Sequence, residues 1–174
     1  DNPDTAILIS RQALYLIIEV NKMIRNDVHL FNKVNSAMRA KRKTLLKILG
    51  SIYHNLGWFS FLKGDYYQAL DFDFKALAIL EVLEKNNPLH NESEITGRKA
   101  VTLGNIGIIY RNQGNYPKAL EYYFKALKLD ETLGSKSRIA IKLGNIGGVY
   151  WNQGDFSKAL NYFFKGLKID KEIG

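Results

Sequence analysis

The sequence repeats itself at a fixed distance of 40 residues, and this period constrains the fold more than any other feature. Leu-Gly-Asn-Ile-Gly at 103–107 returns at 143–147, and Asn-Gln-Gly at 112–114 returns at 152–154. Self-similarity of this length is typical of stacked supersecondary units, in which each unit packs only on its neighbours, rather than of one closed core. Chains of this kind usually bind other chains and rarely carry out chemistry.

The same unit can be followed along most of the chain. Asn55-Leu56-Gly57 matches the later units at a displacement of 50, because extra residues lie around 86–90. Residues 26–41 match nothing in the repeat, and we interpret them as an inserted helical basic segment or as an N-terminal extension of the following helix. Both chain ends fall on repeat boundaries, so we expect a fragment of a longer protein. The predicted organisation is the second helix of a truncated repeat (1–25), the inserted segment (26–41), a unit with a long linker (42–97) and two further units (98–136 and 137–174).

Each unit is predicted to be a pair of helices. In 98–113, apolar residues recur at steps of three and four, which indicates an amphipathic helix. Gly114 ends that helix, and Asn115 is the expected N-cap of the next one. Asp65 and Asp155 hold the same place in the units before and after.

Glycine recurs at one position of the first helix, as Gly57, Gly107 and Gly147. Glycine within a helix costs about 0.8–1 kcal/mol relative to alanine. Repeating this cost at one site indicates that the two helices of a unit approach each other closely there.

The order of small and aromatic residues resembles the tetratricopeptide repeat, and it is carried in 98–136 by Gly107, Tyr110, Ala119, Tyr123 and Ala126. The period is that of the long, 40-residue type, similar to kinesin light chain-like repeats and to the repeat regions of bacterial sensor histidine kinases and regulators. The resemblance implies an all-α fold, a right-handed α-solenoid of antiparallel helix pairs with about three and a half repeats.

The unit at 42–97 departs from this pattern. Ser60 stands where the other units have tyrosine, and Asp73 stands where they have an aromatic residue. We expect the neighbouring Phe72 and Phe74 to compensate in the core.

The resemblance also implies a function, in which the first helix of each unit lines a concave groove that binds a peptide or a partner helix. Asparagine offers both donors and an acceptor, so a row of asparagines is suited to the backbone of an extended peptide. The alternative is that the asparagines satisfy neighbouring backbone and that the aromatic residues belong to the core. The predicted binding residues are Asn55, Asn105, Asn145, Trp58, Phe61, Ile108, Arg111, Asn112, Trp151 and Asn152.

The net charge of +8 is concentrated in residues 21–50, which hold eight basic residues and one acidic residue. The simplest interpretation is a solvated helical face. The alternative function is binding of nucleic acid or an acidic partner through this segment, although Phe31 is its only aromatic residue for base stacking.

Enzymatic activity is not expected. The chain has no cysteine, and His29, His54 and His90 lie on different predicted elements without partners at metal-binding spacing. The glycine pairs at 104–107 and 144–147 lack the residues of a phosphate loop. We therefore predict no catalytic residues, no metal site and no cofactor.

The last predicted helix keeps an apolar side with no following unit to cover it. Solenoids usually end in a polar cap, so we expect either that more protein follows or that this face contacts a partner, and our hypothesis is that the isolated fragment self-associates through this helix. No apolar run is long enough to span a bilayer, and the compartment is left open between bacterial cytoplasm and periplasm. The apolar residues concerned are Leu160, Phe163, Phe164, Leu167 and Ile169.

Overall fold

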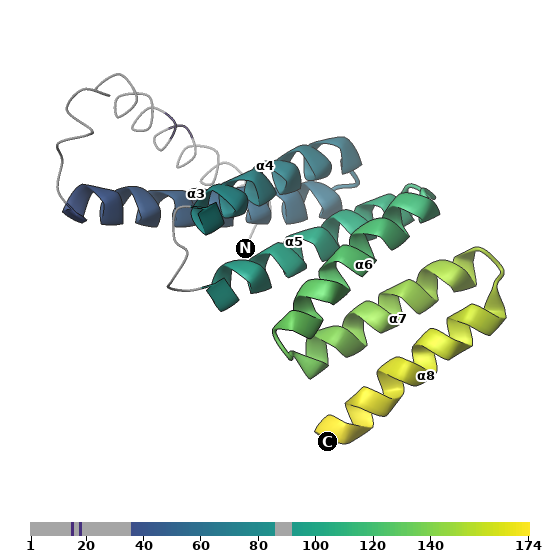
Figure 1. The fold of residues 1–174 in the computed structure, drawn as a ribbon. Coiled ribbons are helices and arrows are strands. Elements are labelled where there is room, and N and C mark those ends of the chain that lie inside the picture. The colour runs from purple at the N-terminus through teal and green to yellow at the C-terminus, as the bar shows by residue number, and fades with distance from the viewer. Residues whose placement is uncertain (1–14, 16–17, 19–35, 86–91) are drawn as a thin grey trace. The chain divides into compact units, whose positions relative to one another are not determined.

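The computed structural model describes residues 15, 18, 36–85 and 92–174. Residues 36–85 and 92–174 form helices joined by short connections, with no strand among them (Figure 1). The predicted 1–25 segment lies outside the described residues except for Tyr15 and Ile18, and the linker at 86–91 lies outside them as well. The helices are α3 (Ser36–Leu62), α4 (Tyr66–Lys85), α5 (Glu92–Asn112), α6 (Tyr116–Thr132), α7 (Lys136–Asn152) and α8 (Phe156–Ile173).

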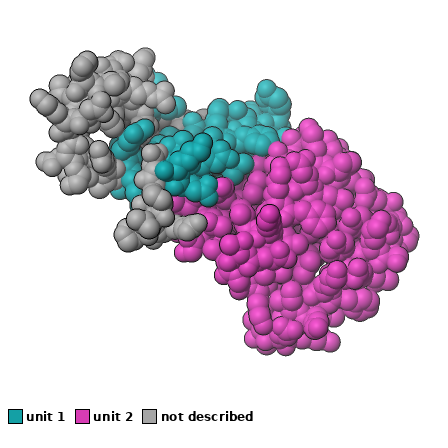
Figure 2. All heavy atoms as spheres, in the orientation of Figure 1, with its two compact units in different colours: residues 1–86 teal, residues 87–174 magenta. Residues whose placement is uncertain are grey.

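The chain divides into two compact units, residues 1–86 and 87–174 (Figure 2). In the first unit, α3 packs against α4. In the second, α5 pairs with α6 and α7 with α8, while α6 also packs on α7 (Figure 1). This arrangement is an all-α helical-repeat solenoid, as the 40-residue period predicts. Helix α3 is continuous from Ser36, so the end of the 26–41 segment belongs to the same helix as the residues that follow it.

The predicted caps are present at the second helix of each pair. The side chain of Asn115 accepts a hydrogen bond from the amide of Lys118 (3.3 Å), and Asp155 accepts one from the amide of Lys158 (3.1 Å). Asp65 accepts from the amide of Gln68 (3.0 Å). Gly114 and Gly154 precede these caps with φ angles of 74° and 79°, a conformation that favours glycine. These turns fix where each second helix starts.

The recurrent glycine makes room for a side chain of the second helix. A Cβ placed on Gly107 would lie 2.8 Å from the ring of Tyr123, and one on Gly147 would lie 2.7 Å from the ring of Phe163. The same Cβ on Gly147 would lie 3.1 Å from the carbonyl oxygen of Ala159. The expected close approach therefore exists, and an aromatic ring lying on the glycine accounts for most of it.

In the first unit, a carboxyl group takes the place of that ring. The carboxyl oxygen of Asp73 lies 2.8 Å from where a Cβ on Gly57 would stand, and the side chain is 1% exposed. Phe72 stacks on Tyr53 with ring centroids 6.1 Å apart, and Phe74 is exposed, so neither replaces the ring opposite Gly57.

The carboxyl group of Asp73 is isolated among the described residues. Neither of its oxygens has a hydrogen-bond partner, and Nδ1 of His54 on α3 lies 4.0 Å from Oδ1. Burial raises the pKa of Asp73 from 3.8 to about 8, because an unpaired charge is poorly solvated there. Burial therefore favours the protonated form of Asp73 at neutral pH.

The contact at Gly107 predicts that glycine-to-alanine substitutions at two positions change the free energy of unfolding in opposite directions. Gly107→Ala places a methyl group against Tyr123 and should lower the free energy of unfolding by about 1–3 kcal/mol. Gly144→Ala is the matched control, because a Cβ there meets no atom within 4 Å, and it should be neutral or stabilising by up to about 1 kcal/mol. Thermal unfolding followed by circular dichroism measures both changes. Equal shifts in the two variants would show that the contact is unimportant.

The buried carboxyl group predicts a pH dependence of stability. Between pH 3.8 and about 8 the folded state keeps a proton that the unfolded state releases, so the free energy of unfolding falls as the pH rises. The slope for this group is at most about 1.4 kcal/mol per pH unit. Asp73→Asn keeps the shape and removes the titration, so it should gain stability relative to the native chain between pH 5 and 8. Urea unfolding at several pH values measures the difference, and a constant difference would contradict the assignment.

Candidate functional site

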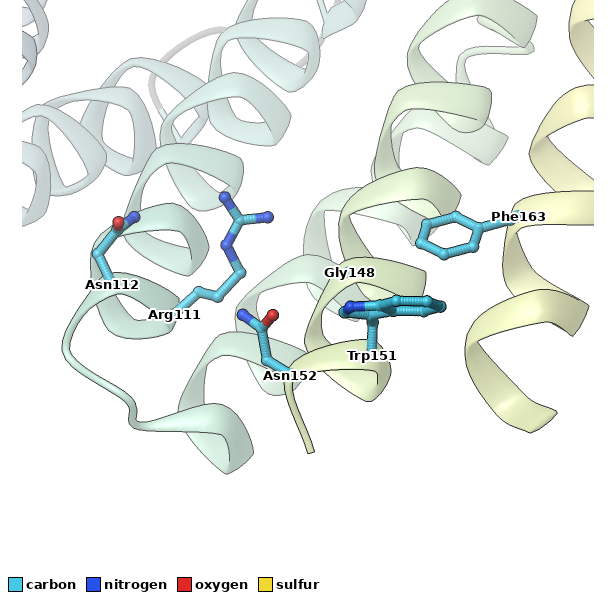
Figure 3. A pocket seen from close by; sticks show the side chains of 6 residues that line it. All are labelled: Arg111, Asn112, Gly148, Trp151, Asn152 and Phe163. Atoms are coloured by element: carbon cyan, nitrogen blue, oxygen red, sulfur yellow. The ribbon is translucent and has the colours of Figure 1, made fainter. Parts of the chain in front are cut away.

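A hollow of about 540 Å³ lies in the second unit, among α5, α7 and α8. It brings together four of the residues that the sequence predicts to bind a ligand: Arg111, Asn112, Trp151 and Asn152. Gly148 and Phe163 complete the lining (Figure 3). These four residues therefore line one hollow, although the two pairs lie 40 residues apart in the sequence.

The repeat places these residues side by side. Arg111 and Asn112 form the last turn of α5, and Trp151 and Asn152 form the last turn of α7. Because both helices end at the same position of the repeat, their final side chains lie at the same level of the stack. Arg111 and Trp151 are therefore counterparts, with opposite chemical character at the two sides of the hollow (Figure 3).

Gly148 gives the guanidinium group of Arg111 the space it occupies. Nη1 of Arg111 lies 3.3 Å from where a Cβ on Gly148 would stand, while the counterpart of Gly148 in α5 is Ile108. A larger residue at 148 would displace the arginine. This departure from the repeat is the local reason why a charged group lies between two helices.

Arg111 provides the positive charge of the site. Its side chain is half-buried, and no carboxylate of the described residues lies within 4 Å of it. Nδ2 of Asn112 donates to the carbonyl oxygen of Ile108 at 2.8 Å, which leaves the amide oxygen of Asn112 as an acceptor. The site therefore offers an unneutralised cation next to a polar amide.

The wall of the hollow opposite Arg111 is aromatic. Trp151 is 53% exposed, and its ring meets Phe156 edge-on with centroids 4.8 Å apart. Phe163 lies against Gly147, one turn before Trp151. The sequence places Phe163 on the buried side of its helix and so misses it as a lining residue. The signal that finds it is the glycine contact, which brings position 163 next to the turn that carries Trp151.

Two of the three predicted asparagines lie on neighbouring helices of this unit. Asn105 on α5 and Asn145 on α7 are half-buried, and neither side chain has a hydrogen bond within the part of the chain that the structure describes. Asn55 is exposed on α3, in the other unit. A row of all three stays a prediction.

The remaining predicted residues lie outside the hollow. Trp58 and Phe61 stack on each other on α3 with centroids 5.3 Å apart, and Trp58 is 41% exposed. Phe61 also contacts Tyr66 at 5.9 Å, and Ile108 is half-buried on α5. Trp58 is thus a surface aromatic group of the first unit.

The described residues contain no group of three histidine, aspartate or glutamate side chains arranged to hold a metal ion. Within the same residues, no helix is both long and apolar enough to cross a membrane.

Comparisons with known proteins agree with the fold. Models of the tetratricopeptide repeat match residues 98–172 and 60–82. The chain is a tetratricopeptide repeat protein. No curated protein matches the sequence.

Solved structures with the same fold share little sequence with this chain. BtubC (BKLC) from P. vanneervenii is 16% identical with a TM-score of 0.61, over 99% of this chain and 75% of that one. The apo form of RapI is 22% identical with a TM-score of 0.62, over 98% of this chain and 43% of that one. MamA is 20% identical with a TM-score of 0.52, over 99% of this chain and 96% of that one.

The family defines the class of function. Tetratricopeptide repeats are typically non-enzymatic scaffolds, so this chain is a protein–protein interaction module.

Proposed function

We propose that this chain binds a peptide along α5 and α7, with a carboxylate of the peptide at Arg111 and an adjacent apolar side chain against Trp151. The observation that carries the proposal is the half-buried guanidinium group, which faces an aromatic wall and has no carboxylate partner among the described residues.

The charge of Arg111 favours an acidic group. A half-buried guanidinium without a counter-ion has lost part of its hydration. A carboxylate replaces the lost contacts with water by accepting two parallel hydrogen bonds. Such charge-assisted bonds contribute about 1.5–3 kcal/mol. Lysine or glutamine in the peptide at this point offers no comparable interaction.

The aromatic wall favours an apolar neighbour. Exposed tryptophan in a pocket is the type of residue that dominates binding energy at protein interfaces. Trp151 and Phe163 supply this surface on the other side of the hollow from the charge, so a carboxylate next to leucine or phenylalanine suits both walls.

The asparagines supply contacts that do not depend on the peptide sequence. Asn105 and Asn145 each hold a donor and an acceptor without a partner in the described residues, and both groups match a peptide backbone. These side chains set orientation, while Arg111 and Trp151 set the choice of ligand.

A role as the input region of a larger bacterial signalling protein extends this proposal. Its support is the resemblance of the Gly-Asn-Ile-Gly units to repeat regions that precede sensor histidine kinases. The natural reading frame tests it, because a kinase or DNA-binding segment must then share the frame.

Two other expectations stay predictions. Half of the basic 21–50 segment, residues 21–35, lies outside the described residues, and a steep salt dependence of oligonucleotide binding tests the alternative role of the segment. Self-association through α8 is supported by that helix's exposed apolar side chains, and light scattering over a range of concentrations tests it.

The peptide proposal is tested with an array of ten-residue peptides that carry Glu, Gln or Lys next to Leu or Phe. The native chain should prefer the Glu set by about tenfold or more. Arg111→Gln should abolish that preference, and Trp151→Ala should weaken binding of every peptide with an apolar neighbour.

Lys128→Gln is the matched control, because it removes the same charge from an exposed position on α6. Circular dichroism must show that each variant is folded. If the native chain and Arg111→Gln rank the three peptide sets identically, Arg111 does not select the ligand and the proposal is wrong.

A further inference from the structure

The side chain of Tyr123 on α6 ends in a buried hydroxyl group that has no hydrogen-bond partner. The residue is 0% exposed, and its hydroxyl oxygen is unpaired within the part of the chain that the structure describes. Such a group costs stability, because folding removes it from water and supplies no hydrogen bond in exchange. Buried polar groups without a partner are rare in folded proteins, so this one calls for an explanation.

The repeat shows that packing alone does not require the hydroxyl group. Phe163 is the counterpart of Tyr123 in α8, and each ring lies on a glycine of the preceding helix. A Cβ on Gly107 would lie 2.8 Å from the ring of Tyr123, and a Cβ on Gly147 would lie 2.7 Å from the ring of Phe163. Phenylalanine therefore fills this place without a polar atom, and the oxygen of Tyr123 needs another explanation.

The repeat also places Arg111 beside Tyr123. Arg111 follows Gly107 by one helical turn, so it lies on the side of α5 against which the tyrosine ring packs. At the same positions one repeat later, Trp151 and Phe163 line one hollow together. Because equal positions of a repeat have equal neighbours, the arginine and the tyrosine are adjacent as well.

The charge of Arg111 acts on this hydroxyl group. Burial raises the pKa of Tyr123 to about 12, and the positive charge of Arg111 opposes that rise. The guanidinium group also lies against α7, because its Nη1 is 3.3 Å from where a Cβ on Gly148 would stand. Arg111 therefore borders both the hollow and the buried hydroxyl group.

The two groups have complementary hydrogen-bonding capacity. A guanidinium group carries five N–H donors in one plane, and a carboxylate at one edge uses two of them. A phenolic oxygen can accept a hydrogen bond from one of the remaining donors. Neither the side chain of Arg111 nor that of Tyr123 has a hydrogen bond among the described residues, so both are available for this contact.

We propose that the hydroxyl group of Tyr123 positions Arg111 in the peptide complex, where it accepts a hydrogen bond from the guanidinium group while another edge of that group binds the peptide carboxylate. The inference rests on the proposed peptide site and adds a positioning residue to it. A fixed acceptor behind the arginine sets the plane of the guanidinium group and reduces the rotational freedom that is lost on binding. The hydroxyl group thus lowers the stability of the free chain and raises the selectivity of the site.

The test is Tyr123→Phe in the whole chain, with two labelled ten-residue peptides that differ only in Glu or Gln next to Leu. The thermal midpoint should rise by about 2–4 °C, because the unpaired hydroxyl group is removed and the ring is kept. Fluorescence anisotropy should show that the preference for the Glu peptide falls from about tenfold to about threefold. A merely structural role of Tyr123 would not make the chain more stable and less selective at once.

Two further variants separate the positioning role from other effects. Tyr122→Phe removes a hydroxyl group from the neighbouring position of α6, where the ring stacks on Tyr110 with centroids 5.5 Å apart, and it should leave the preference for Glu unchanged. Arg111→Gln abolishes the preference by itself. Adding Tyr123→Phe to Arg111→Gln should change the preference no further, because the hydroxyl group acts only through the arginine.

Four results would contradict the proposal. An equal preference for Glu in the native chain and in Tyr123→Phe would show that the hydroxyl group does not position Arg111, although the peptide site itself would stand. Weaker binding of both peptides by the same factor, or loss of the fold by circular dichroism, would show that the hydroxyl group serves packing. If the native chain has no preference for Glu, the peptide site is wrong, and the role of Tyr123 is wrong with it.

Discussion

The contact between a glycine and a side chain 16 residues later determines how close the two helices of each pair lie. It recurs as Gly107 with Tyr123, Gly147 with Phe163 and Gly57 with Asp73. A Cβ at any of these glycines would lie within 2.8 Å of the facing side chain, so the spacing depends on its absence. The same contact positions the candidate site, because Trp151 follows Gly147 by one helical turn and therefore lies beside Phe163.

The lining of the hollow gets its chemical character from positions at which the repeats 98–136 and 137–174 differ. Arg111 and Trp151 hold the same position of the repeat, as do Ile108 and Gly148. If these two repeats were identical, the hollow would present the same residue type on both sides. Instead, Arg111 occupies the space that Gly148 leaves, and the ring of Trp151 lies on the other side of the hollow. The repeat supplies the geometry, and the departures from it supply the chemistry.

This division explains what the sequence could predict. The helix pairs, the caps at Asn115 and Asp155, and the gathering of Arg111, Asn112, Trp151 and Asn152 all follow from periodicity, because equal positions of a repeat become neighbours in space. The exposure of Phe163 does not follow, since it depends on which helix covers α8 and not on the local pattern. The isolated carboxyl group of Asp73 was also not predictable in detail. The sequence marks it as a departure, but only the packing shows that Phe72 and Phe74 lie elsewhere.

Three aspartates illustrate how packing assigns different roles to one residue type. Asp130 is fully buried and bound by two basic side chains of α7, so its charge fixes the register between the repeat at 98–136 and the repeat at 137–174. Asp73 is equally buried but has only His54 nearby, so the protonated form is favoured and the group acts as a small polar filler opposite Gly57. Asp170 has the position of Asp130 without its burial or its partners. Because a carboxylate in water loses little by remaining unpaired, it does not destabilise α8.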